Sequence, residues 1–309
     1  MTTMAKDREK EVYRVTLAGS LINAILVVFK LVAGFLGNSA AMIADGVHSL
    51  SDFLTDIVVM VFVHISNKPQ DKDHDYGHGK FETLATALIG MALFAVGVYI
   101  LINGVQKIWM ALSGETLERP EFIALLAAIV SILLKEWAFQ FTARTGKRIG
   151  SKAVVANAWH HRSDALSSIG TAIGIGGAIL LGESWVILDP IAAVVVSFFI
   201  LRTAFQLIRQ ALDELLEKSL PDEVEEDIVK ISESEPEVSE VHHLKTRRIG
   251  NAIAIEMHLR MPGNISLYES HEHATNIERK LRERFGKDTH IGLHVEPVKI
   301  NGEYQEPTK

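Results

Sequence analysis

The chain has 309 residues, of which 48% are hydrophobic and none is cysteine, and its formal net charge is −7. The lack of cysteine excludes disulfides and thiolate metal sites, and the negative charge offers no basic surface for nucleic acid. Apolar residues are concentrated before about residue 208, so we expect a membrane domain over residues 1–208 and a soluble domain over residues 209–309.

Several stretches before residue 208 are long and apolar enough to cross a bilayer, which takes about 20 residues in a helix. Six qualify, and they are residues 14–36, 40–66, 81–109, 122–143, 153–181 and 186–208. The connections at 37–39 and 182–184 contain no Lys or Arg, whereas those on the opposite side are rich in both. The positive-inside rule therefore predicts six spans with both termini in the cytoplasm.

The second span carries ionisable side chains along one stripe of its predicted helix, namely Asp45, His48, Asp52 and Asp56. An Asp facing lipid costs about 2.5–3.5 kcal/mol even on lenient insertion scales. We therefore expect the stripe to face other helices or a water-filled cavity. A polar seam that only holds helices together is the alternative interpretation.

The fifth span begins with the sequence WHHRSD at residues 159–164. Its His160 and Asp164 repeat the spacing of His48 and Asp52, so each pair lies one helical turn apart on one face. Two imidazoles and two carboxylates form a set of four donors suited to Zn²⁺. The neighbouring His161 and Arg162 are expected at a wet, interfacial end of the span.

Other polar residues lie inside the predicted spans. Lys30 with Asn23 in the first span, and Lys135 with Glu136 in the fourth, are interpreted as packing or snorkelling side chains. The loop after the second span places Asp71, His74 and His78 at helical spacing. A solvated acidic loop is the alternative for this cluster.

The soluble domain shows an α-β-β-α-β pattern. An acidic helix follows Pro221, a hairpin turns at Gly250-Asn251, a second helix covers 266–286, and a last strand covers 289–297. The fold class expected is thus an all-α six-helix transmembrane domain plus a cytoplasmic α+β domain, an open ferredoxin-like sandwich.

The segments HSLSDFLTD (48–56), YGHGKFETL (76–84) and WHHRSDALSS (159–168) closely resemble the cation diffusion facilitator family, over residues 12 to 297. The resemblance implies a homodimeric secondary transporter, not an enzyme, that exports divalent transition metals in exchange for protons. Its partners would be membrane lipid, metal ions and protons, and its location the cell's inner membrane.

The resemblance also implies roles for particular residues. The transport site would be His48, Asp52, His160 and Asp164; a second metal site, in the loop, would be Asp71, His74 and His78; and a hinge salt bridge would join Lys80 to Glu217. A regulatory binuclear zinc site in the cytoplasmic domain would comprise His242, His258, His271, His294 and Glu296, although close relatives have Asp in place of that glutamate.

The donor set favours zinc as the cargo, because two histidines suit zinc better than metals that prefer all-oxygen sites. Co²⁺, Cd²⁺, Fe²⁺, Mn²⁺ and Ni²⁺ are alternatives. Because metal binding needs neutral imidazole and ionised carboxylate, it expels protons, and proton antiport follows if the site faces the cytoplasm and the exterior alternately. The alternative function is a metal-gated channel or sensor without proton coupling. An intramembrane metallohydrolase is disfavoured, since the chain has no H-E-x-x-H motif.

Overall fold

The computed structural model describes residues 3–66, 68, 70–148, 152–250 and 252–305. Within the helices, the side chains of Asp56 and His160 are outside the described part. The chain divides into two compact units. The first comprises residues 1–60 and 88–208, and the second comprises residues 61–87 and 209–309.

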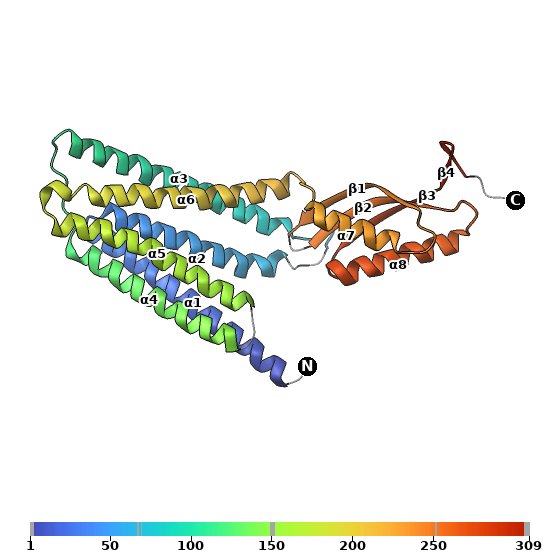
Figure 1. Cartoon of the computed structure of the whole chain (residues 1–309), viewed down its shortest axis with the longest axis horizontal. Coiled ribbons are helices and arrows are strands. Elements are labelled where there is room, and N and C mark those ends of the chain that lie inside the picture. The colour runs from blue at the N-terminus through green and yellow to red at the C-terminus, as the bar shows by residue number, and fades with distance from the viewer. Residues whose placement is uncertain (1–2, 67, 69, 149–151, 251, 306–309) are drawn as a thin grey trace. The chain divides into compact units, whose positions relative to one another are not determined.

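Six long helices dominate the first two-thirds of the chain (Figure 1). They are α1 (Thr3–Leu36), α2 (Ala40–Ser66), α3 (Lys80–Leu112), α4 (Phe122–Arg148), α5 (Lys152–Leu180) and α6 (Leu188–Leu215), with the short 3-10 helix η1 (Glu183–Trp185) before α6. In the first unit α4 packs against both α1 and α5. The buried residues at these contacts are mostly alanines, which let helix backbones approach closely.

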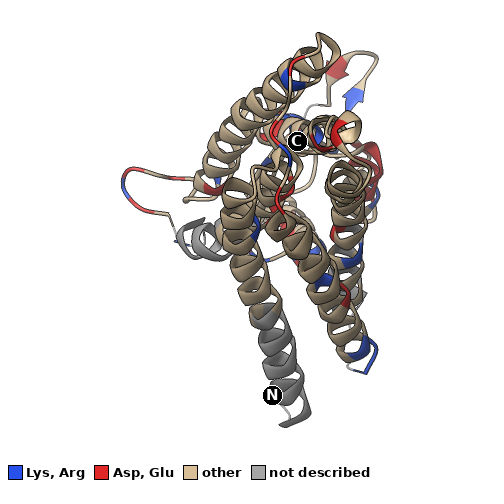
Figure 2. Cartoon of the chain, turned by 90° about the vertical axis from the view of Figure 1, so that its left-hand side faces the viewer, with Lys and Arg blue, Asp and Glu red and all other residues tan. Residues whose placement is uncertain are grey.

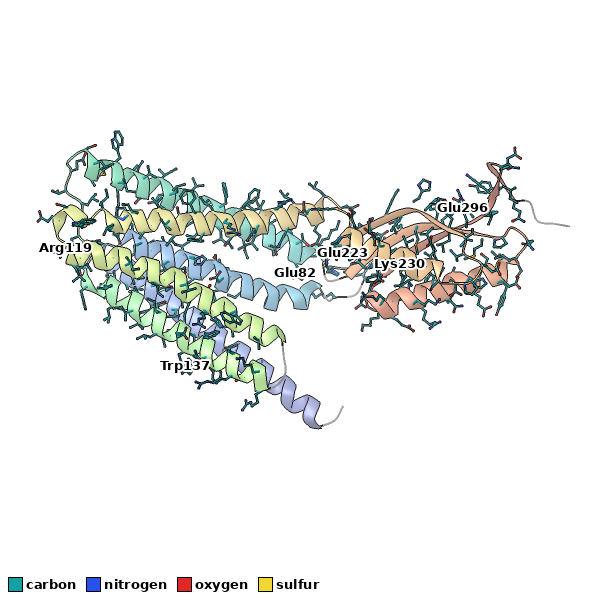
Figure 3. All side chains as sticks on the ribbon, in the orientation of Figure 1. Glu82, Arg119, Trp137, Glu223, Lys230 and Glu296 are labelled. Atoms are coloured by element: carbon teal, nitrogen blue, oxygen red, sulfur yellow. The ribbon has the colours of Figure 1, made fainter. Side chains whose placement is uncertain are left out.

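The outer faces of these helices are apolar. Trp137 points outward from α4 with 55% of its surface exposed (Figure 3), and Leu133 and Phe198 are similarly exposed. In Figure 2 the long helices are mostly drawn in the colour of uncharged residues. Large apolar side chains outside and small ones inside are the arrangement of a helical membrane domain, because lipid and not water surrounds it.

Four segments among the described residues are long and apolar enough to span a membrane. They are Gly19–Leu36, Lys80–Leu112, Phe122–Arg148 and Glu183–Leu215. Among the described residues of α5, a shorter apolar segment, Asp164–Leu180, was found. Six membrane crossings therefore stay a prediction. The two helices without a full-length span among the described residues are α2 and α5, which carry the paired His and Asp residues.

The second unit ends in an α+β sandwich (Figure 1). Its elements are α7 (Asp222–Glu233), β1 (Glu240–Ile249), β2 (Ala252–Met261), α8 (Leu267–Phe285), β3 (His290–Pro297), β4 (Lys299–Ile300) and β5 (Glu303–Tyr304). The sheet order is β1-β2-β3, with β1 antiparallel and β3 parallel to β2. The predicted α-β-β-α-β order is confirmed, and the small β4–β5 hairpin is an addition that the sequence analysis missed.

One face of the sheet is covered by α7 and α8. Ile255, Met257 and Leu259 alternate along β2 and are at most 1% exposed. They pack against Ile277 of α8 and Ile228 of α7. Since strand side chains alternate between faces, the intervening His258 and Arg260 lie on the opposite, helix-free face. That face carries a cluster of histidines that includes His258.

Candidate metal centres

The first candidate centre lies in the helical unit. The ligand atoms of His48 and Asp52 on α2 and of Asp164 on α5 all lie within 4.8 Å of one another. The Nδ1 atom of His48 is buried, and no hydrogen-bond partner for it occurs among the described residues. His160 begins the preceding turn of α5, but its side chain is outside the described part. One imidazole and two carboxylates thus converge as donors for a divalent cation.

Lys135 on α4 contacts the same cluster. The Nζ atom of Lys135 donates a hydrogen bond to Oδ2 of Asp164 at 2.7 Å, and the two side chains are 2% and 4% exposed. Of the two interpretations of Lys135, packing or snorkelling, snorkelling is therefore wrong, and the side chain packs inside the unit. Its ammonium stays inside because it finds a carboxylate there.

A second buried lysine lies beside the cluster. Lys30 on α1 and Asp45 on α2 are both fully buried, with Nζ 2.7 Å from Oδ2. Lys30 also donates to the hydroxyls of Ser49 and Ser168, each at 3.0 Å. Snorkelling is wrong for this lysine too, and the pairing accounts for why Asp45, although on the polar stripe of α2, is not in the metal cluster.

The residues that flank His160 differ in environment. Arg162 is 44% exposed, and its guanidinium carbon lies 4.7 Å from the ring centroid of Phe139, as expected for an interfacial end. His161 is only 3% exposed, so the expectation of a wet position is wrong for this residue. It faces α1, where a Cβ added to Gly19 would lie 3.1 Å from its Nε2 atom.

The second candidate centre is the loop before α3. Asp71 accepts contacts from both histidines, with His74 Nδ1 3.2 Å from Oδ1 and His78 Nε2 3.2 Å from Oδ2. Backbone hydrogen bonds, first from Asp73 and then from His74, help hold the pKa of Asp71 below its usual value. The three ligand atoms lie within 4.8 Å of one another. An ionised carboxylate between two imidazoles is a donor set that suits a divalent cation, and the loop folds around it.

The predicted hinge pair is formed within the second unit. Lys80 Nζ lies 3.1 Å from Oε1 of Glu217, and Arg247 Nη1 lies 3.7 Å from Oε2. The hydrogen bond from Lys80, followed by the charge of Arg247, lowers the pKa of Glu217. The carboxylate is thus shared between the start of α3 and strand β1.

Glu214, which the sequence analysis missed, makes a second connection at the same junction. Its Oε1 atom accepts hydrogen bonds from the Thr83 hydroxyl and from the backbone N–H of Gly250, both at 2.7 Å. Gly79 packs so closely on the β1–β2 turn that an added Cβ would lie 2.5 Å from the carbonyl oxygen of Ile249. The helix ends and the hairpin therefore contact each other backbone to backbone.

The third candidate centre lies on the helix-free face of the sheet. His242, His258 and His294 are directly paired across β1, β2 and β3. Glu296 is labelled on the sheet in Figure 3, with Oε1 2.8 Å from His258 Nδ1 and Oε2 3.4 Å from His242 Nε2. The hydrogen bond from His258 outweighs burial and lowers the pKa of Glu296.

The members of this cluster are not equally close. The ligand atoms of His242, His258 and Glu296 lie within 4.8 Å of one another, and His294 Nε2 lies 3.7 Å from Oε1 of Glu296. His271 is exposed on α8, and the structure does not bring it into the described group. 

Two further residues touch the cytoplasmic cluster and were not singled out from the sequence. His243 forms a β-bulge with φ 50°, and its ring lies 5.1 Å from that of His258. Tyr304 of the small hairpin donates a hydrogen bond to Glu296 at 3.2 Å. The sequence pattern gave no signal for either contact.

Comparison with known proteins decides the family. The family described as "Cation efflux transmembrane domain" matches residues 16–216, and "Cation efflux protein, cytoplasmic domain" matches residues 220–298. The chain is a cation diffusion facilitator. Cation diffusion facilitators are metal efflux transporters and not enzymes, as the sequence predicted, and this one is an integral membrane protein whose helical membrane domain precedes a cytoplasmic α+β domain.

Relatives of this cation diffusion facilitator extend over most of its length. The manganese efflux system protein MneP of Bacillus subtilis (strain 168) is 32% identical over 298 residues, which cover 95% of this chain and 99% of the relative. Metal tolerance protein C1 of Arabidopsis thaliana is 34% identical over 285 residues, covering 88% of this chain and 60% of the relative. Among solved structures, the metal-bound C-terminal domain of the CzcD transporter from Thermotoga maritima is 28% identical with a TM-score of 0.24, covering 26% of this chain and 92% of that one.

Proposed function

We propose that this chain exports Zn²⁺ from the cytoplasm by proton antiport with alternating access, and that His48, Asp52, His160 and Asp164 form its transport site. The observation that carries the proposal is the convergence of His48, Asp52 and Asp164 within 4.8 Å in the helical unit. Intramembrane ionisable residues generally mark an ion pathway, because their burial in lipid is costly.

Zinc is preferred as the cargo for a reason of ligand chemistry. Imidazole nitrogen with carboxylate oxygen suits Zn²⁺, whereas Mn²⁺ favours sites built from oxygen. The second candidate is Mn²⁺, because one relative that matches 95% of this chain is named a manganese efflux protein. Replacing His48 with Asp is expected to shift transport from Zn²⁺ toward Mn²⁺, and an unchanged preference would count against the role of the imidazole.

Proton coupling follows from the same donors. A bound metal requires neutral imidazoles and ionised carboxylates, so metal entry displaces protons and protonation helps to release metal. If the site opens alternately to the two sides, the two flows are exchanged. A metal-gated channel would instead give flux that does not depend on a pH gradient.

The remaining assignments complete the proposal. The chain would cross the inner membrane six times with both termini in the cytoplasm and act as a homodimer. Metal binding at the sheet cluster of His242, His258, His294 and Glu296, joined by His271, would regulate transport by tightening the dimer. The loop cluster of Asp71, His74 and His78 would capture metal on the cytoplasmic side.

The test uses full-length protein in proteoliposomes with a zinc-sensitive dye, with and without an imposed pH gradient. Flux is expected to rise with the gradient and to be abolished by Asp52→Ala and by His160→Ala. A His161→Ala variant is the matched control, because it removes the imidazole at the adjacent position of α5, which is not a proposed ligand. Near-normal flux in both Asp52→Ala and His160→Ala would remove this site from the mechanism, and gradient-independent flux would favour the channel.

A further inference from the structure

The ammonium of Lys135 lies against a carboxylate of the membrane metal cluster. Its Nζ atom is 2.7 Å from Oδ2 of Asp164, and Lys135 reaches it from α4, which packs against α5. With 2% exposure, this side chain is as deeply enclosed as the apolar core around it. A buried charge of this kind needs a reason, because the desolvation of an ion pair commonly offsets its attraction.

The ammonium and a bound metal would compete for the same carboxylate. A zinc–oxygen bond is about 2.0–2.2 Å long, so a metal on Asp164 would place its double charge close to Nζ. Two cations a few ångströms apart repel strongly in a medium of low dielectric constant. Metal binding at Asp164 therefore requires Lys135 to move aside. If Lys135 stays in place, the affinity of Asp164 for the metal is lower.

The charges of the cluster support this competition. Lys30 and Asp45 neutralise each other at 2.7 Å, which leaves Asp52, Asp164 and Lys135 among the described charged groups near the cluster. Without Lys135, the two carboxylates would match a divalent cation in charge. With Lys135, the metal-free cluster is closer to neutral, and the metal-bound cluster carries an excess positive charge.

We propose that Lys135 is a tethered counter-cation that competes with the transported metal for Asp164 and so keeps the site weak enough to release its cargo. This inference rests on the proposed transport site. A carrier needs a site that binds strongly enough to load and weakly enough to unload. Lys135 acts through Asp164 and is not itself a ligand. A purely structural role, holding α4 against α5, is the competing explanation.

The binding test uses full-length protein in detergent with His74→Ala and His258→Ala, so that the loop and cytoplasmic clusters bind less metal. Zn²⁺ and Mn²⁺ are each titrated into this background with and without Lys135→Met. Removing a nearby unit charge is expected to tighten binding by about tenfold or more. Lys30→Met is the matched control, since it breaks the other buried lysine–aspartate pair, and no comparable tightening is expected.

The transport test uses proteoliposomes with the two histidines restored. Lys135→Met is expected to lower both KM and kcat, because a metal that is held tightly leaves slowly. A structural role would instead lower kcat through loss of folded protein and leave KM unchanged. Binding that is unchanged or weaker in a folded Lys135→Met protein would overturn the inference.

Two further variants keep the outcome decisive. If Lys135→Met does not fold without metal, Lys135→Gln is tested in the same way, and excess Zn²⁺ is expected to restore folding because it replaces the missing positive charge. Failure of Zn²⁺ to rescue either variant would also overturn the inference. Asp52→Asn separates the two proposals. If Asp52→Asn leaves metal binding intact, the proposed transport site itself is wrong. If Asp52→Asn abolishes binding but Lys135→Met does not tighten it, only the role of Lys135 is refuted.

Discussion

His258 and Glu296 are joined across two parallel strands, with Nδ1 of the histidine 2.8 Å from Oε1 of the glutamate. Oε2 of the same glutamate lies 3.4 Å from His242, so one carboxylate lies between two imidazoles on the sheet. A glutamate is one methylene longer than the aspartate that the family resemblance implies at this position. The contact distances indicate that the longer side chain still reaches both histidines.

Glu296→Gln is expected to weaken Zn²⁺ binding by the sheet cluster by about tenfold or more, because a neutral amide replaces an anionic ligand. Calorimetric titration of the full-length protein in a background without Asp52 and His74 would measure it. Tyr304→Phe is the control, since it removes only the 3.2 Å hydrogen bond to Glu296 and leaves its charge. Equal affinities for wild type and Glu296→Gln would show that this carboxylate is not a ligand.

Glu235 is a buried carboxylate of the second unit with three side-chain hydrogen-bond partners. It is 5% exposed in the side chain and accepts hydrogen bonds from Lys280 at 2.7 Å and from His273 and Asn276 at 3.0 Å. Burial alone would raise the pKa of Glu235, but the hydrogen bonds, first from Lys280, outweigh it and the pKa lies below its usual value.

The loss of folding stability at acid pH should therefore depend partly on Glu235. Because its pKa is lower in the folded than in the unfolded state, its contribution is complete above about pH 4.3, the unfolded value, and is lost as the pH falls through the folded value. Glu235→Gln is expected to destabilise the second unit by about 1–3 kcal/mol at pH 7. Thermal unfolding from pH 7 to pH 3 should show this difference shrinking with acid, and a constant difference would contradict the prediction.

We expect transport to tolerate reversal of the charges of Lys80 and Glu217 only when both are reversed together. The pair is exposed, so its effect on the stability of the protein is expected to be small. Lys80→Glu and Glu217→Lys are each expected to lower transport by about fivefold or more, and the double reversal to restore it. The measurement is metal flux in proteoliposomes, with thermal unfolding to check folding. Flux that stays low in the double variant would show that the residues do not act as a pair.

The close contact at Gly79 should tolerate no side chain. A Cβ there would lie 2.5 Å from the Ile249 carbonyl oxygen, so the loop and the β1–β2 turn would have to separate. Gly79→Ala is expected to cost about 1–3 kcal/mol by overpacking and to reduce flux. Gly170→Ala is the control, since nothing lies within 4 Å of the added Cβ and alanine favours the helix. Similar melting temperatures for both variants would contradict the prediction.

Much of this architecture was readable from local pattern. The alternation of Ile253, Ile255, Met257 and Leu259 predicted the buried face of β2, and these side chains are at most 9% exposed. The four-residue spacing of His48 and Asp52 on one helix predicted that they share a face, and their ligand atoms lie within 4.8 Å. Periodicity is informative here because it follows directly from backbone geometry. The roles assigned to these residues as ligands stay predictions.

The chain by itself determined the six long helices, the α-β-β-α-β order of the second domain, that the first part is a membrane domain, and which family it belongs to, but not the small β4–β5 hairpin. The tertiary structure decided what the long charged side chains do. A lysine in a span can reach the interface or an internal carboxylate, and only the packing of α4 on α5 selects Asp164 as the partner of Lys135. Glu214 likewise gains its partners from segments distant in sequence, and Tyr304 reaches Glu296 across the turn between β3 and the β4–β5 hairpin. Neither contact follows from the sequence alone, because a flexible side chain has no preferred contact until the backbones around it are fixed.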